Sequence, residues 1–136
     1  MVAGMRSWCK EFAEHQRMEV GFRTDVAHPL PFEIGLCLFR VLQEALHNAV
    51  KHSGVKQVDV QLAESSNELL LTISDLGAGF DPEASKQGRG LGLTSMQERA
   101  RLVNGTINIE SKLGVGTTIH VHVPFNSEDA SRRAAS

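Results

Sequence analysis

The sequence predicts an α+β domain with two layers, in which a mixed, mostly antiparallel sheet carries helices on one face. Two observations favour this fold class. Most of the predicted strands come in consecutive pairs, instead of alternating one by one with helices. One long predicted helix also carries a wide apolar stripe, which is typical of a helix that packs on a core. At 136 residues, the chain is long enough to bury one such core.

The first half of the chain contains two predicted helices with a strand between them. In residues 5–16 apolar side chains recur at helical spacing, and in residues 18–24 they alternate with polar ones, as in a strand. After Pro31 a long helix is expected to about Ser53, where Gly54 provides a stop. Its apolar stripe consists of Ile34, Leu38, Val41, Leu42, Ala45, Leu46 and Ala49.

The second half contains two predicted hairpins, separated by a loop and a helix. Apolar and polar residues alternate in each strand, and a short turn joins the two strands of each pair. The loop is rich in Gly, Pro, Ser and charged residues. The predicted elements are, in order, strands at 58–62 and 69–74, a loop at 75–92, a helix at 93–102, and strands at 106–111 and 117–123.

Three regions are expected along the chain. Residues 1–17 form a helix that leads into the domain, residues 18–125 form the domain itself, and residues 126–136 form a disordered tail because they are small, polar and charged. Trp8 and Phe12 of the first helix belong either to the core or to a surface where a preceding domain docks. We favour the core.

Composition and charge exclude several classes of protein. The formal net charge is -2 and the pI is near 6.3, so no basic field points to nucleic acid or to an acidic membrane surface. No apolar run approaches the ~20 residues that span a bilayer, and no signal-peptide pattern opens the chain. Cys9 and Cys37 are too few for a disulfide framework or a thiolate metal site, and both are expected to be buried. We therefore expect a cytoplasmic domain without direct membrane contact.

Glycine clusters are the most informative feature of the composition. Glycine lets backbone N–H groups approach an anion, and a glycine-rich segment at a helix start adds the positive end of the helix dipole. Such a segment favours phosphate binding, although GxGxG also occurs in ordinary turns. Neither the dinucleotide-binding fingerprint nor the GxxxxGK[ST] loop is present. The clustered residues are Gly77 and Gly79, then Gly88, Gly90 and Gly92, then Gly114 and Gly116.

Polar residues gather near the expected end of the long helix. Glu44 and Asn48 are four residues apart and therefore share a helical face, and Lys51 and His52 follow within the next turn. An acid, an amide and a lysine suit Mg²⁺ and a triphosphate, because Mg²⁺ prefers oxygen ligands together with phosphates and water. A solvated helix face with side-chain pairs four residues apart is the alternative.

Asp75 ends an apolar strand directly before a Gly-x-Gly turn. A carboxylate is costly to bury there without a partner. It can accept a hydrogen bond from the exocyclic amine of adenine, whereas guanine would present a carbonyl oxygen and leave the pair unmatched. The alternative is an aspartate that only forms a turn.

Four ordered motifs together resemble a known family. They are RVLQEALHNAVKHS, DLGAGFD, GRGLGLTSMQERA and GVGTTIHVHVP. They are similar to the N box and three glycine boxes of the sensor histidine kinase ATP-binding domain. This domain has the Bergerat-type fold, also found in gyrase, heat-shock ATPase chaperones, mismatch-repair ATPases and anti-sigma-factor kinases. The sequences of the first and third motifs are similar to those of the nitrate-sensor-like subfamily. The resemblance covers about residues 18–125.

The resemblance implies roles for the polar residues on the long helix. Asn48 would coordinate Mg²⁺, and Glu44 would lie beside the γ-phosphoryl group of ATP as a base or polarising group. Lys51 would contact the phosphates. His52 would lie near the nucleotide, where relatives often carry Tyr.

The resemblance also implies roles for the residues after the strand. Asp75 would bind the adenine amine, with Gly79 and Thr117 supporting that pocket. Leu76 departs from the family, in which a polar residue is usual. Arg89 either contacts a phosphate or is a solvated residue of the lid. The remaining nucleotide-binding residues implied, mostly in a flexible lid over the phosphates, are Gly77, Gly88, Gly90, Leu91 and Gly92.

Family members transfer the γ-phosphoryl group of ATP to a histidine on a separate dimeric helical domain and then to a response regulator. In the subfamily that histidine is followed by Asp or Glu, and none of the six histidines here is. We therefore expect a catalytic fragment that binds Mg·ATP, works with a separate phosphoacceptor domain and phosphorylates itself little. The alternative is a free-standing serine kinase of the anti-sigma-factor type. A weaker one is a module that binds nucleotide only to regulate.

His120 and His122 lie two residues apart on the last predicted strand and share one of its faces. They could both face a metal ion, but the sequence offers no third ligand. We favour a solvated strand face.

Overall fold

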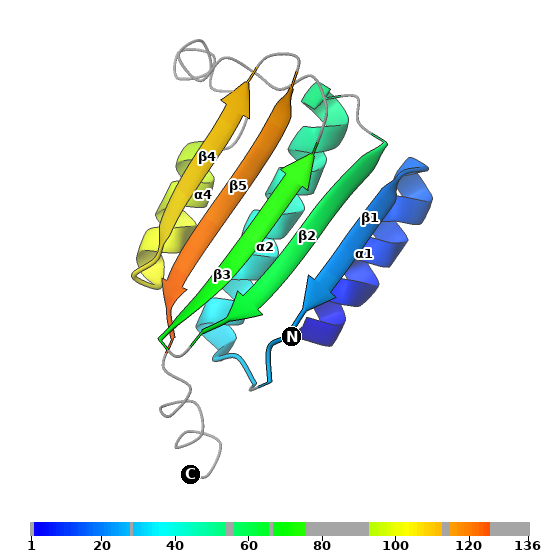
Figure 1. Ribbon diagram of the computed structural model, residues 1–136. Helices are drawn as coiled ribbons and strands as arrows, with labels where there is room; N and C mark the ends of the chain where they lie inside the picture. The colour runs from blue at the N-terminus through cyan, green and yellow to red at the C-terminus, as the bar shows by residue number, and fades with distance from the viewer. Residues whose placement is uncertain are drawn as a thin grey trace.

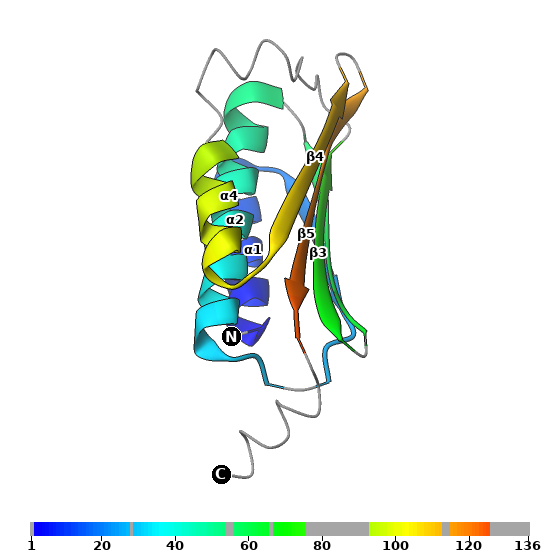
Figure 2. The same cartoon turned by 90° about the vertical axis from the view of Figure 1, so that its left-hand side faces the viewer.

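The architecture is a sandwich of two layers, with a sheet on one side and helices on the other (Figure 1). The computed structural model describes residues 2–27, 29–53, 56–65, 67–75, 93–112 and 115–125. Seen from the side, the helices cover a single face of the sheet (Figure 2). The predicted fold class is therefore confirmed. Residues 76–92 of the predicted loop, which include the predicted lid, and the predicted tail at 126–136 lie outside the described residues.

The helices and strands confirm the expected elements, with small shifts at their ends. The long helix differs most, because it is α-helical only through Asn48 and then continues as a π-helical turn. Within the described ranges, no helix is long and apolar enough to cross a membrane. The elements are α1 (Val2–Gln16), β1 (Glu19–Thr24), α2 (Phe32–Asn48), η1 (Ala49–Ser53), β2 (Gln57–Glu64), β3 (Glu68–Asp75), α4 (Leu93–Leu102), β4 (Thr106–Lys112) and β5 (Gly116–Pro124).

The described part of the chain forms a five-stranded sheet with the order β1-β2-β3-β5-β4. β1 lies parallel to β2, because α2 crosses over between them. The pairs β2–β3 and β4–β5 are antiparallel, as expected for two hairpins, and β3 is also antiparallel to β5. Since β3 lies beside β5, the end of β3 meets the start of β5, and Asp75 is opposite Thr117.

The core lies between the sheet and the helices. Buried and more exposed residues alternate along β2, β3 and β5, so each strand turns its apolar side chains toward the helices. The predicted stripe of α2 covers the middle of the sheet, with Ile34 half-buried and its other residues buried. From α1, Met5, Cys9 and Phe12 join this core, and Trp8 packs against it. Burial of Phe12 and both cysteines was expected from the sequence.

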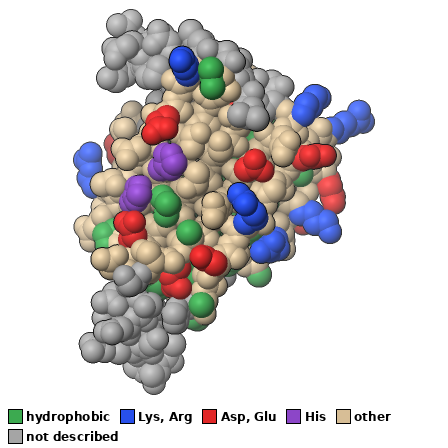
Figure 3. All heavy atoms as spheres, viewed as in Figure 1, with side chains coloured by type: hydrophobic (Ala, Val, Ile, Leu, Met, Phe, Trp, Pro, Cys, Tyr) green, Lys and Arg blue, Asp and Glu red, His purple; other side chains and the backbone are tan. Residues whose placement is uncertain are grey.

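The opposite face of the sheet is open, and Figure 3 shows polar, charged and histidine side chains on it. His120 and His122 of β5 are half-buried, and Nδ1 of His122 lies 3.5 Å from Oε2 of Glu68. Over the part of the chain that is described, no group of three or more His, Cys, Asp or Glu side chains could hold a metal ion. Both histidines thus lie on the open face of the sheet, with His122 beside Glu68.

Candidate functional site

Several element ends meet at one end of the molecule, shown as the upper end in Figures 1 and 2. α2 and η1 finish there, β3 ends there, and β5 begins there. α4 also begins in the upper half of the helical layer (Figure 2). Most of the site residues predicted in the described part of the chain belong to these ends, although they are far apart in sequence.

Asp75 faces the helical layer. Successive side chains of a strand point to opposite faces, so Asp75 continues the buried row of Leu71 and Ile73 on β3. Its partners across the sheet, Val58 and Thr117, are buried on that same face. A half-buried carboxylate thus lies at the inner rim of the sheet, beyond the last apolar residues of β3.

Thr117 is the buried polar residue beside Asp75, with only 9% of its surface exposed. Its Oγ1 lies 2.8 Å from Oγ of Ser111 on β4, and the Ser111 hydroxyl also donates to the carbonyl of Gly116 at 3.3 Å. This pair of contacts fixes the position of the Thr117 hydroxyl at the start of β5. Sequence reasoning missed Ser111, because the contact depends on the register between β4 and β5.

Glu44 and Asn48 lie on the flank of α2 that faces α4. Residues spaced by three or four positions share a helix face, and Cys37, Val41, Glu44 and Asn48 form such a row. The row begins against α4, where the Cys37 thiol donates to the carbonyl of Arg99 at 3.2 Å. Glu44 and Asn48 are half-buried on this flank.

The segment after Asn48 has a different winding from the rest of the helix. η1 is a π-helical turn, and the backbone N–H of Ala49 donates to the carbonyls of both Ala45 and Leu46. Turns of this kind occur often at functional sites. Lys51 lies on η1 with its side chain exposed. The side chain of His52 lies outside the description.

The remaining predicted site residues lie in the segment 76–92, outside the described residues. They are Gly77, Gly79, Gly88, Arg89, Gly90, Leu91 and Gly92. The structure nevertheless gives the ends of this segment, because β3 ends at Asp75 and α4 begins at Leu93.

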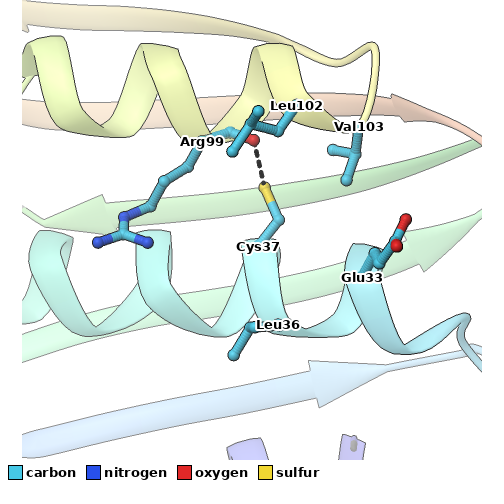
Figure 4. Close-up of a pocket in the computed structure, with 6 residues that line it drawn as sticks. All are labelled: Glu33, Leu36, Cys37, Arg99, Leu102 and Val103. Atoms are coloured by element: carbon cyan, nitrogen blue, oxygen red, sulfur yellow. Dashed lines mark hydrogen bonds between the residues drawn. The ribbon is translucent and has the colours of Figure 1, made fainter.

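A groove of about 340 Å³ lies between α2 and α4 (Figure 4), nearer the start of α2 than Glu44 and Asn48 are. Its lining is mostly apolar. Burial raises the pKa of the Cys37 thiol, although the nearby Arg99 guanidinium partly opposes this. No sequence signal pointed to this groove. The residues that line it are Glu33, Leu36, Cys37, Arg99, Leu102 and Val103.

The comparison with known families decides which fold family this arrangement belongs to. Residues 35–127, more than half of the chain, match the family described as histidine kinase-, DNA gyrase B-, and HSP90-like ATPase. The chain belongs to this ATPase family. The match begins inside α2 and extends past the end of β5, so it includes Glu44, Asn48, Asp75 and Thr117. The resemblance predicted from the four motifs is thereby confirmed at the level of this ATPase family.

One curated relative of this ATPase domain is the oxygen sensor histidine kinase NreB of Staphylococcus carnosus strain TM300. The two are 41% identical over 124 residues, which cover 90% of this chain and 36% of the relative. The chain thus spans little more than a third of the length of that relative.

Solved structures agree with the fold of the family. The histidine kinase domain of the blue-light activated histidine kinase from Erythrobacter litoralis EL346 matches with a TM-score of 0.74 at 20% identity, covering 90% of this chain and 64% of the other. A second structure of that kinase matches with a TM-score of 0.75 at 19% identity, covering 93% of this chain and 42% of the other. At such identities the likeness shows the shared fold.

Proposed function

We propose that this chain is the ATP-binding catalytic domain of a two-component sensor histidine kinase of the nitrate-sensor-like subfamily. It binds Mg·ATP and donates the γ-phosphoryl group to a histidine on a separate dimerisation and phosphoacceptor domain, which passes it on to a response regulator. The family match and the named relative support the class of protein. The observation that carries the proposal is the inward-facing Asp75 at the end of the molecule where α2 finishes. A cytoplasmic location belongs to the same proposal.

Asp75 is proposed to select adenine. Its carboxylate accepts a hydrogen bond from the exocyclic amine of the base, and the buried surroundings of Thr117 make an unmatched partner costly. Guanine places a carbonyl oxygen at that position, which repels the carboxylate. Gly77, Gly79 and Thr117 complete the proposed base pocket.

The end of α2 is proposed to bind the magnesium ion and the phosphates. Asn48 and Glu44 offer amide and carboxylate oxygens on one flank, which are the hard donors that Mg²⁺ accepts beside phosphate oxygens and water. When bound, Mg²⁺ neutralises charge that develops during phosphoryl transfer. Asn48 provides its ligand, Glu44 acts as base or polarising group, and Lys51 contacts the phosphates. The proposed lid contributes Gly88, Arg89, Gly90, Leu91 and Gly92.

The phosphoryl group is proposed to leave this domain rather than stay on it. None of the six histidines precedes an acidic residue, as the acceptor does in the subfamily. Transfer therefore needs a second, helical domain that brings its histidine to the γ-phosphoryl group, and positioning supplies most of the catalysis.

The test is to incubate the chain with γ-labelled ATP and Mg²⁺, alone and with a separately produced phosphoacceptor domain of this subfamily. We expect acid-labile label on the acceptor histidine and almost none on the chain itself. An acceptor variant with that histidine changed to Ala is the control. Stable phosphohistidine on the chain would contradict the proposal. Acid-stable phosphoserine on a partner would instead support the anti-sigma-factor type of kinase.

A further inference from the structure

A group of aromatic contacts reaches the residue beside the proposed magnesium ligand. The centroid of the His47 ring lies 6.0 Å from that of Trp8 and 5.3 Å from that of Phe12, with interplanar angles of 77° and 79°. Trp8 and Phe12 are stacked on each other with centroids 5.0 Å apart. Edge-to-face contacts of this kind are favourable. His47 directly precedes Asn48, so α1 contacts a neighbour of the proposed ligand without contacting the ligand itself through these rings.

His47 lies where α2 changes its winding. The N–H of Ala49 is shared between two carbonyls, and the π-helical turn starts at that residue. The helix therefore changes its winding directly after Asn48, although Ala49 keeps the regular bond to the carbonyl of Ala45. Leu46 and Ala49 are buried in the core and hold this turn close to the sheet. His47 is exposed, and its ring adds a contact between this turn and α1 on the side of the helix.

His47 and Asn48 lie on different flanks of α2. Consecutive residues of an α-helix are about 100° apart around the axis. The row that includes Asn48 begins against α4 at Cys37, whereas the His47 ring lies against α1. If the last turn of α2 rotated, His47 would lose its contact with the rings of α1. The same rotation would turn the Asn48 side chain away from its present direction.

We propose that His47 is a positioning residue for the nucleotide site. Trp8 and Phe12 hold its ring, this contact fixes the rotation of the last turn of α2, and Asn48 is thereby presented to Mg·ATP. The inference rests on the proposed function, because it takes Asn48 as the magnesium ligand. Coupling between sites is reciprocal, so Mg·ATP also stabilises the contact between His47 and α1. The contact of α1 with His47 thus raises the affinity of the nucleotide site for Mg·ATP.

The first test measures the dissociation constant of Mg·ATP by calorimetry for point variants. We expect His47→Ala to bind Mg·ATP about five-fold more weakly. His47→Phe retains a ring for the two edge-to-face contacts and is expected to bind as the wild type does. Arg40→Ala is the matched control, because Arg40 is exposed on the same side of α2 two turns earlier. It is expected to leave the dissociation constant unchanged.

A double-mutant cycle shows whether the effect passes through the α1 contact. We expect Trp8→Leu to weaken Mg·ATP binding as His47→Ala does, and the double variant to bind no more weakly than either single one. Full additivity of the two effects on affinity would overturn the inference, because independent sites add. Thermal melting of each variant identifies effects on stability alone.

The fluorescence of Trp8 provides a direct readout, because Trp8 is the single tryptophan of the chain. We expect its emission to change on addition of Mg·ATP, with the dissociation constant found by calorimetry, and this change to be smaller in His47→Ala. Lower melting temperatures with unchanged affinity in both His47→Ala and Trp8→Leu would overturn the inference and leave the proposed function standing. A wild-type chain that bound no Mg·ATP would overturn both.

Discussion

Asp75 on β3 is paired with Thr117 on β5, and both side chains face the helices. The pair lies where β3 ends and β5 begins, at the same end of the molecule as the finish of α2 (Figure 1). A carboxylate and a fixed hydroxyl next to an apolar core can discriminate between bases by hydrogen bonding to their polar edges. A base that left one of these polar groups without a hydrogen bond would bind at a cost in free energy. The strand order, which pairs β3 with β5, thus brings together the two residues that are proposed to select adenine.

Asp75→Asn is expected to lower the affinity for ATP about 5- to 150-fold, because a mismatched polar partner costs about 1–3 kcal/mol. The affinity for GTP is expected to fall much less, so the preference for ATP narrows. Competition against a fluorescent ATP analogue measures both values.

Asp59→Asn is the matched control for this experiment, since Asp59 is exposed on β2 and lies opposite Ser74 on the open face. It should change neither affinity. A wild-type chain that bound GTP as well as ATP would contradict the role of Asp75.

Thr117→Val and Thr118→Val separate binding from stability. Each removes one contact between hydroxyl groups, Thr117 with Ser111 at 2.8 Å and Thr118 with Ser74 at 3.2 Å. We expect each to lower the free energy of unfolding by about 1 kcal/mol. Only Thr117→Val is expected to weaken ATP binding, because Thr118 lies on the open face of the sheet. Urea denaturation and ATP titration of both variants check this, and equal losses of affinity would argue against the pocket.

Much of the fold could be predicted from the local pattern of apolar residues. The α2 stripe and the alternation in β2, β3 and β5 follow directly from the periods of helices and strands. The Asn104-Gly105 stop also ends α4 as expected: Asn104 adopts a positive φ of 59°, and the Gly105 N–H donates to the carbonyl of Ala100 at 2.7 Å. The parallel pairing of β1 with β2 was not specified in the prediction, because it depends on how α2 crosses between these strands.

The site was harder to predict where it depends on tertiary contacts. The strand end at Asp75 and the helix face of Glu44 and Asn48 are visible in the sequence. The contact of Ser111 with Thr117 depends on strand register, and the rings around His47 depend on how α1 lies against α2. The π-helical turn was also missed, since the apolar spacing in the sequence predicted one continuous helix to about Ser53.

Leu42→Ala is expected to destabilise the fold by about 2–5 kcal/mol, because it leaves a cavity in the core between α2 and the sheet. Leu42 is fully buried. Leu102→Ala is the comparison, since Leu102 is 84% exposed on α4 and its truncation should change stability little. Urea denaturation of both variants measures the difference. Similar losses would contradict the described core.

Stability is expected to fall at alkaline pH because of Cys9. Burial raises the pKa of its thiol from 9.0 to about 11, although Arg6 partly opposes this. Between these values the unfolded chain loses a proton that the folded chain keeps. The contribution to stability is therefore complete below the unfolded pKa and is lost as the pH rises through the folded pKa.

Urea denaturation over this alkaline range, for wild type and Cys9→Ala, measures the effect. The variant is expected to be less stable overall because its side chain is smaller, but its stability should fall less steeply with pH. Equal slopes for the two chains would contradict the raised pKa.

The most direct measurement is the magnesium dependence of nucleotide binding in Asp75→Asn and Asn48→Ala, using ATP and AMP. If the two residues bind opposite ends of one nucleotide, Asp75→Asn weakens binding of both ligands with or without Mg²⁺. Asn48→Ala then removes only the gain in ATP affinity that Mg²⁺ gives and leaves AMP binding intact. Unchanged Mg²⁺ dependence in Asn48→Ala, or unchanged AMP binding in Asp75→Asn, would contradict a shared Mg·ATP site.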